Sequence, residues 1–262
     1  MTLTADARSP TGRETMSSAL PDAVNYHDWI MDKVRGVVAG DALLEIGPGY
    51  GQYTRPLSER VDRLVALDID PECVRGLAGI ADNVEPRLGD LNDPAFASRV
   101  GEGRFGYVLC LNVLEHIEDD VRALRNMGAV LRPGGKLLLL VPAHPSLYGA
   151  MDRLAGHHRR YTRKSLRSRL AAAGLHVDEL SHFNAVGGVG WWVNARFFKP
   201  RDLSAPSINR QILLFDRYAL PLSRMIDPFT RGFFGQSLWV VARRPGGAPR
   251  EAAPAGRDGC AR

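Results

Sequence analysis

The residues best suited to chemistry begin with a glycine-rich loop that follows a short apolar run, Leu43-Leu-Glu-Ile-Gly-Pro-Gly-Tyr-Gly51. Glycines after a buried strand let the backbone approach a ligand closely, and the following helix offers free N–H groups. Glu45 places a carboxylate two residues before the first glycine. A dinucleotide-binding loop would read G-x-G-x-x-G, but Gln52 occupies the third glycine's place. The spacing therefore argues against a nicotinamide-dependent oxidoreductase, although a plain strand-to-helix turn also fits the loop taken alone.

Two further carboxylates follow at places where they could meet the same ligand. Val65-Ala-Leu-Asp68 ends the next apolar run with an acid, and a carboxylate there can accept hydrogen bonds from both hydroxyls of a ribose. Asp70 precedes Pro71 and is predicted to cap the next helix instead. Leu88-Gly-Asp-Leu91 supplies another acid, Asp90, for which an exposed loop position is the alternative.

Two histidines could move a proton near neutral pH. His116 ends the segment Asn112-Val-Leu-Glu-His116, and His157 lies in Gly156-His-His-Arg-Arg-Tyr-Thr162. Either could act as a general base, and the alternative for His116 is a hydrogen bond that holds its own loop. Arg160 and Tyr161 are the best candidates for binding an anionic acceptor, because they lie beside the histidines in a predicted loop. A guanidinium group suits carboxylate or phosphate. The arginines and lysine that follow these two residues, as far as Arg169, fit a solvated helix face.

The elements that would position these residues alternate between strands and helices. Apolar runs at 42–46, 64–67, 107–111 and 136–141 predict strands, and 176–183 and 237–243 could add two more. Helical spacing is seen at 25–38, 119–131 and 165–173, and Arg132-Pro-Gly-Gly135 predicts a turn. This alternation predicts an α/β fold with a parallel sheet.

One domain is predicted over residues 21–243, between polar tails at 1–20 and 244–262 that we expect to be disordered. The stretch 187–235 is rich in aromatic residues and is predicted to form a helical insertion. It could cap an acceptor site or add to the core. It could also contact a membrane or a lipid-linked substrate, through the aromatic and basic residues Trp191, Trp192, Arg196, Phe197, Phe198 and Lys199.

The composition is that of an ordinary globular protein, with 45% apolar and 24% charged residues and a net charge of +5. The mild charge does not demand nucleic acid as a partner. The three cysteines form neither a disulfide framework nor a metal-ligand spacing. The first twenty residues lack the apolar core of a signal peptide. We therefore expect a cytoplasmic location.

Five segments, in order over residues 43–141, resemble the motifs of class I S-adenosylmethionine (SAM)-dependent methyltransferases. They are LEIGPGYG, VALD, LGDL, VLCLNVLEH and LRPGGK. The resemblance implies a Rossmann-like, seven-stranded, mostly parallel sheet with helices on both faces. It also implies that the glycine loop wraps the amino-acid end of SAM, that Glu45 reaches the ammonium group, and that Asp68 holds the ribose. The SAM-binding residues assigned in this way are Glu45, Gly47, Gly49, Gly51, Asp68, Ile69, Asp90, Leu91 and Asn112.

The segments around the two histidines resemble ubiquinone-biosynthesis O-methyltransferases and small-RNA 2′-O-methyltransferases, and more loosely bacterial sugar and natural-product methyltransferases. Some members of the first two groups bind a divalent metal through Glu-x-x-Glu-His and a later histidine. Here Asn112 replaces the first glutamate, which leaves Glu115, His116 and His157 as the alternative, a weakened metal site. We predict a metal-independent enzyme.

We expect methyl transfer to an oxygen of an anionic small-molecule, glycan or natural-product acceptor. His116 and His157 are the predicted catalytic residues. A nitrogen or carboxylate acceptor, an RNA acceptor, and a non-catalytic SAM-binding protein are the alternatives. The predicted substrate-binding residues are Tyr148, His158, Arg160 and Tyr161.

Overall fold

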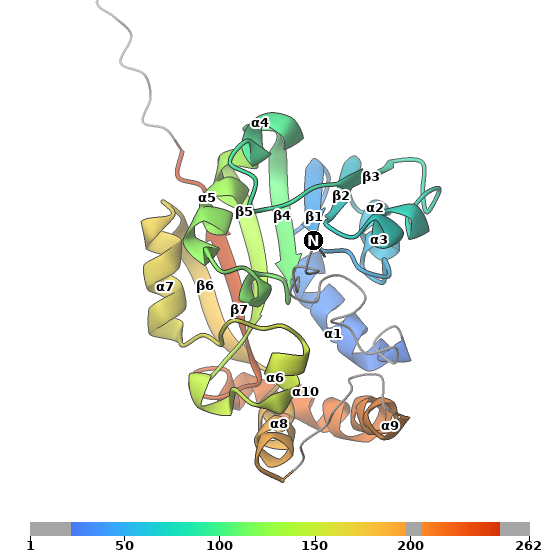
Figure 1. The fold of residues 1–262 in the computed structure, drawn as a ribbon, viewed down its shortest axis with the longest axis vertical. Helices are drawn as coiled ribbons and strands as arrows, with labels where there is room; N and C mark the ends of the chain where they lie inside the picture. Colours follow the sequence, from blue (N-terminus) through green and yellow to red (C-terminus); the bar gives the residue numbers. More distant parts are fainter. Residues whose placement is uncertain (1–21, 198–205, 247–262) are drawn as a thin grey trace, which may run out of the picture.

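In the computed structural model, which describes residues 22–197 and 206–246, seven strands form one sheet in the order β3-β2-β1-β4-β5-β7-β6 (Figure 1). The pairs from β3 to β5 are parallel, whereas β7 runs antiparallel to both β5 and β6. The expected seven-stranded, mostly parallel sheet is confirmed. The strands are β1 Ala42–Ile46, β2 Arg63–Asp68, β3 Val84–Leu88, β4 Phe105–Leu111, β5 Leu131–Pro142, β6 His176–Phe183 and β7 Ser237–Arg243.

Helices cover both faces of the sheet because its central strands are apolar on both sides, as parallel strands buried on two faces must be. One face packs against α4 (Phe96–Val100), α5 (Asp120–Val130) and α7 (Arg163–Ala172). The other packs against α1 (Val24–Arg35) and α2 (Thr54–Ser58). The short helix α3 (Pro71–Gly76) lies beside β2 and β3, and Asp70 caps it as predicted by accepting a hydrogen bond from the backbone N–H of Glu72.

The predicted turn Arg132–Gly135 lies inside the bounds of β5 rather than before it. The pairing of β5 with β4 jumps from Phe105 opposite Leu131 to Tyr107 opposite Lys136, so these residues form an irregularity in the ladder. Gly134 has a φ of 78°, which a residue with a Cβ adopts only at a cost. The glycines therefore bend the strand instead of ending it.

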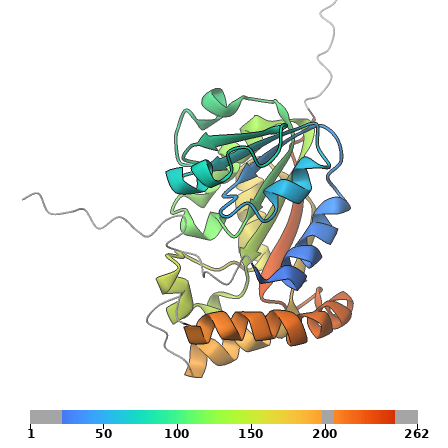
Figure 2. The ribbon, with the colours of Figure 1, turned by 90° about the vertical axis from the view of Figure 1, so that its right-hand side faces the viewer.

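The carboxyl ends of the parallel strands face a group of helices at the bottom of Figure 1: α6 (Ala150–Leu154), α8 (Ala185–Phe197), α9 (Pro206–Leu214) and α10 (Leu220–Thr230). A π-helical turn, Phe215–Ala219, joins α9 directly to α10. The resulting long helix crosses the bottom of the molecule in Figure 2. Asp216 ties this helix to α1, because its carboxylate accepts hydrogen bonds from the backbone N–H groups of Asn25 and Tyr26.

The aromatic stretch 187–235 therefore contains most of α8 and the long helix α9–α10. Among the described residues, no helix is both long and apolar enough to cross a membrane. The predicted N-terminal tail and most of the predicted C-terminal tail lie outside the described residues. So do the membrane-contact candidates Phe198 and Lys199.

Candidate active site

The glycine loop leaves β1 in a conformation that requires glycine. Gly47 and Gly49 have φ values of 68° and 55°, and a Cβ on Gly47 would lie 2.4 Å from Cγ2 of Val113. Just before the loop, the carboxylate of Glu45 is buried and accepts a 2.7 Å hydrogen bond from the Thr54 hydroxyl. Burial raises the pKa of Glu45 to about 7. The loop and this carboxylate together form one end of a cavity.

Asp68 ends β2 beside that loop. Its carboxylate accepts hydrogen bonds from the backbone N–H groups of Gly49, at 3.2 Å, and Asp70, at 2.9 Å. Burial raises its pKa despite these hydrogen bonds. The two bonds fix the orientation of the carboxylate, so it is prepared to accept hydrogen bonds from a ligand without further ordering.

A cavity of about 650 Å³ runs along the carboxyl ends of β1, β2 and β4 and continues under α8 and α9–α10. Eight of the nine predicted SAM-binding residues line it: Glu45, Gly47, Gly49, Asp68, Ile69, Asp90, Leu91 and Asn112. Gly51 does not. A Cβ on Gly51 would lie 2.5 Å from Cδ2 of Leu77, so a glycine here lets the loop pack against Leu77, the residue after α3, and its role in SAM binding stays a prediction.

Sequence reasoning missed several residues of the cavity wall. Tyr26 and Tyr53 line it from the α1 and α2 side, and the side chain of Tyr26 forms a hydrogen bond with Asn112. Trp191 lines it from α8. The helical spacing at 25–38 revealed that Tyr26 belongs to an inward face, but periodicity alone does not distinguish a core position from a cavity wall.

His157 is held by a buried carboxylate that the sequence did not single out. Its Nδ1 lies 2.9 Å from Oδ1 of Asp152, a residue with no exposed surface. The same carboxylate accepts hydrogen bonds from Nε of Arg160, at 2.8 Å, and from the backbone N–H of Gly149, at 2.9 Å. Burial acts to raise the pKa of Asp152, but the bonds from His157 and Arg160 outweigh it and hold that pKa below its ordinary value.

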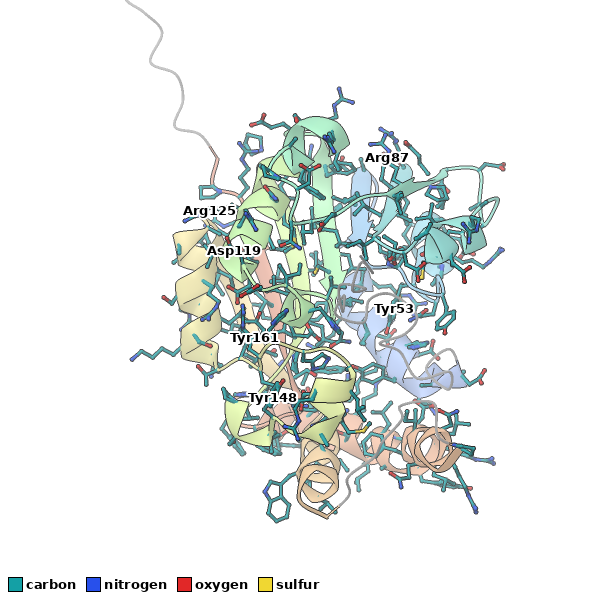
Figure 3. The ribbon with its side chains drawn as sticks, viewed as in Figure 1. Tyr53, Arg87, Asp119, Arg125, Tyr148 and Tyr161 are labelled. Carbon is teal, nitrogen blue, oxygen red and sulfur yellow. The ribbon has the colours of Figure 1, made fainter. Side chains whose placement is uncertain are left out.

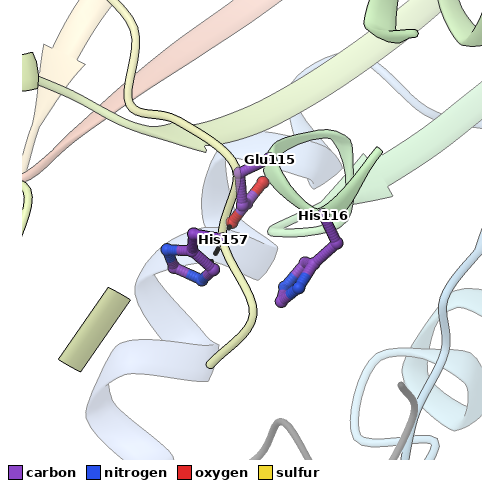
Figure 4. Close-up of side chains that lie close together, drawn as sticks. All are labelled: Glu115, His116 and His157. Carbon is purple, nitrogen blue, oxygen red and sulfur yellow. Dashed lines mark ion pairs between the residues drawn. The ribbon is translucent and has the colours of Figure 1, made fainter. Parts of the chain in front are cut away.

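His157, Glu115 and His116 gather at the cavity wall (Figure 4). Nε2 of His157 is 4.0 Å from Oε1 of Glu115, and the rings of His157 and His116 lie 4.7 Å apart. Burial raises the pKa of Glu115 to about 7. Burial and the neighbouring His157 and His158 lower the pKa of His116 to about 4. At neutral pH the His116 ring is therefore uncharged.

These three side chains also form a group that could hold a metal ion, since one ligand atom from each lies within 4.8 Å of the others. Two imidazoles and one carboxylate would suit a transition metal better than magnesium, which prefers oxygen ligands. The side chain of Asn112, which stands in the place of the first glutamate, is hydrogen-bonded to Tyr26. The expectation of a metal-independent enzyme stays a prediction.

The structure brings Arg160 alone of the four predicted substrate-binding residues to the cavity wall. Tyr148 donates a hydrogen bond to the carbonyl oxygen of His157, and His158 is exposed. Tyr161 is packed in the core, where its hydroxyl donates to Asp120. Figure 3 labels Tyr148 and Tyr161 on the α6–α7 side and Tyr53 on the α1 side.

The guanidinium group of Arg160 already has partners within the protein. Its guanidinium group pairs with Asp152, donates to the carbonyl oxygen of Ala143 and stacks on Trp191, with its central carbon 4.6 Å from the ring centre. Its side chain is almost fully buried. Arg160 therefore shapes the cavity wall together with Trp191, and its recognition of an anionic acceptor stays a prediction.

Comparison with known proteins gives this site its class. Residues 28–180 match the family model for a methyltransferase domain, which is more than half of the chain. A ubiquinone biosynthesis O-methyltransferase of Aeromonas salmonicida is 28% identical over 124 residues, which cover 46% of this chain and 51% of that protein. The chain thus spans about half the length of the curated relatives it matches.

Solved structures show the same fold. A SAM-dependent methyltransferase from Mesorhizobium loti superposes with a TM-score of 0.56 at 18% identity, covering 83% of this chain and 98% of that one. Geranyl diphosphate C-methyltransferase from Streptomyces coelicolor gives 0.57 at 15% identity, covering 84% and 77%. The chain belongs to the class I SAM-dependent methyltransferases.

The residues present fit SAM, the cofactor of this class. Glu45 supplies a buried carboxylate for an ammonium group, and the glycines leave room for a ligand where a Cβ would clash. Asp68 supplies oriented acceptors for ribose hydroxyls. Oε1 of Gln52, on the cavity wall, is buried and has no hydrogen-bond partner among the described residues. A polar ligand would satisfy this atom.

Proposed function

We propose that this protein transfers the methyl group of SAM to an oxygen atom of a small-molecule, glycan or natural-product acceptor, with His157 as the general base. The observation that carries this proposal is the pairing of His157 with buried Asp152 at the wall of the cavity that Glu45 and Asp68 also line. The relatives named as ubiquinone biosynthesis O-methyltransferases support transfer to oxygen.

Bound SAM would supply a methyl group on a positively charged sulfur. The protein has to hold this group in line with the acceptor and to exclude water, and such positioning can supply about 7–11 kcal/mol of the barrier. Glu45 and the glycine loop would hold the amino-acid end, Asp68 the ribose, and Asp90 and Leu91 the adenine. These residues and the two histidines line the same cavity, so cofactor and base would meet within it.

His157 is arranged to accept a proton. A carboxylate beside Nδ1 favours the tautomer in which Nδ1 carries the hydrogen and Nε2 has the free lone pair. Asp152 is therefore a positioning residue that presents Nε2 as the acceptor atom. Once Nε2 takes the proton of a hydroxyl, the charged imidazole is stabilised by Asp152 at 2.9 Å and by Glu115 at 4.0 Å.

The acceptor end of the cavity combines this base with apolar walls. Trp191 of α8, Ile212 of α9, Phe215 of the π-helical turn and Leu220 of α10 line it. We propose that the helices of the stretch 187–235 act as the cap predicted from the sequence, which excludes water and holds the apolar part of the acceptor.

The proposal is tested by offering the protein radiolabelled SAM with a panel of phenols, sugars, amines, carboxylic acids and RNA. We expect label to pass to hydroxyl compounds, because these are the acceptors that require a base. Label passing to carboxylic acids in wild type and in a His157→Ala variant alike would contradict the proposed base, since a carboxylate carries no proton to remove. Tight SAM binding without transfer to any acceptor would favour the non-catalytic alternative.

A further inference from the structure

The long helix α9–α10 exposes a continuous row of apolar side chains, here called the apolar row. Its members are spaced three or four residues apart, which places them on one face of a helix. Tyr218, Met225 and Phe229 are 66%, 72% and 81% exposed. From its first to its last residue the row extends for about 22 Å at 1.5 Å per residue. The apolar row consists of Leu214, Tyr218, Leu222, Met225 and Phe229.

The face that this helix turns inward carries buried polar residues beside the apolar Phe215 and Leu220. Asp216, Ser223 and Asp227 are buried and engaged in hydrogen bonds, Asp216 with the start of α1 and the other two with Asn184. The docking of the helix onto the domain is therefore achieved without the apolar row. A contiguous row of exposed apolar side chains is typical of an interaction surface.

Arginines flank the apolar row. Arg210, Arg217, Arg224 and Arg231 recur every seven residues, and all four are exposed. All four side chains therefore belong to the exposed surface of the long helix and of the residue that follows it. The guanidinium carbon of Arg217 lies 5.5 Å from the ring centre of Tyr218, and Arg224 pairs with Asp32 of α1. The two acidic residues of α9–α10, Asp216 and Asp227, both face inward.

We propose that this face of α9–α10 docks on a membrane surface that contains anionic phospholipids, with the helix lying in the plane of the interface. An apolar row beside a row of arginines is the pattern of interfacial helices, whose apolar side chains enter the acyl boundary while cations reach phosphate groups. A second copy of the chain, placed symmetrically on the same face, would bring the exposed arginine rows of the two copies together. Charge complementarity therefore favours the anionic bilayer.

This surface differs from the aromatic cluster that the sequence suggested for membrane contact. Trp191 faces the cavity and stacks on Arg160, while its neighbour Trp192 is 49% exposed on α8. The long helix also lines the cavity with Ile212, Phe215 and Leu220. Docking would thus place the cavity on the inner side of the helix, about one helix diameter from the bilayer surface. The inference does not depend on the identity of the methyl acceptor.

The experiment is co-sedimentation of the full chain with vesicles of phosphatidylcholine alone and with vesicles that also contain phosphatidylglycerol. We expect binding to the anionic vesicles that weakens as salt is added. Phe229→Glu should lower the partition coefficient about tenfold or more. Arg217→Gln combined with Arg231→Gln should lower it about fivefold per arginine. Arg75→Gln, on the exposed surface of α3, changes the net charge by the same amount as Phe229→Glu and should bind as wild type does.

SAM affinity, measured for every variant, shows that the fold is intact. The proposal is overturned if the wild-type chain does not bind anionic vesicles, or if Phe229→Glu binds them as well as Arg75→Gln does. Self-association in sedimentation equilibrium that Phe229→Glu abolishes, without vesicle binding, would instead make this face an interface between copies.

Discussion

Nδ1 of His157 lies 2.9 Å from Oδ1 of Asp152, and that carboxylate is fully buried and shared with Arg160. One contact thus orients the proposed base, and the other compensates a buried guanidinium charge. We therefore expect Asp152 to contribute both to the proposed catalysis and to stability. An amide keeps the shape of the carboxylate but not its charge, so one substitution tests both roles, each with its own measurement.

Asp152→Asn is expected to lower kcat by about 10²–10⁴-fold, because an amide N–H facing Nδ1 favours the tautomer in which Nε2 is protonated. The pH dependence of kcat should change as well, which a purely structural role would not cause. The variant should also unfold at a lower temperature, since the charge of Arg160 loses its partner. Near-normal kcat with an unchanged pH profile would contradict the positioning role.

His157→Ala is expected to lower kcat by about 10²–10⁴-fold while SAM affinity stays unchanged. His176→Ala, at an exposed site on β6, is the matched control and should turn over normally. A His157→Ala variant with near-normal turnover would reduce the residue to a structural role.

Asp68→Ala is expected to weaken SAM binding by about 1–3 kcal/mol through the loss of charge-assisted hydrogen bonds. Calorimetric titration measures this change directly. Glu72→Ala removes an exposed carboxylate from the adjacent helix α3 and should leave the affinity unchanged. Equal affinity of wild type and a folded Asp68→Ala variant would refute the assignment of the ribose site.

SAM affinity is expected to fall as the pH decreases below about 7. Burial raises the pKa of Glu45 to about 7 in the ligand-free protein. Below that pH the carboxyl group is protonated and uncharged, and it no longer attracts an ammonium group. The dissociation constant should therefore rise by up to about tenfold per pH unit below the pKa. The Glu45→Gln variant should bind SAM more weakly, and its affinity should change less with pH. If SAM affinity depends on pH in the same way in the variant and in wild type, another group is responsible for the titration.

Methyl transfer is expected to proceed without a metal ion. Glu115, His116 and His157 lie close enough to bind one, but Asn112 stands where some related enzymes have a further ligand, and its amide is engaged by Tyr26. Activity measured before and after dialysis against EDTA should be the same. Loss of activity in EDTA and its return with magnesium or zinc would show that the three residues form a metal centre.

Most of the fold and the cofactor end of the site followed from local sequence patterns. A buried strand, a glycine loop and a helix are adjacent in the chain, so the position of Glu45 relative to Gly47 is set within a few residues. The acid at the end of β2 lies beside this loop because neighbouring parallel strands end at the same edge of a sheet. Eight of the nine predicted SAM-binding residues accordingly line the cavity.

The acceptor end of the site could not be predicted in this way. Its arrangement depends on contacts between elements that are distant in the sequence, and local sequence patterns do not contain these contacts. The segment Gly156–Thr162 is polar in sequence, but packing buries Tyr161 and Arg160 and leaves His158 exposed. In the sequence, nothing distinguishes Asp152 from an ordinary surface acid. Only the tertiary structure shows that its carboxylate lies beside His157. In α10 the polar residues Ser223 and Asp227 turn inward because Asn184 offers hydrogen bonds there. The sequence by itself thus determined six of the seven strands of the described sheet and the glycine loop. Tertiary packing added β3, which has no apolar run of its own, and decided which polar side chains are buried and which apolar ones face outward.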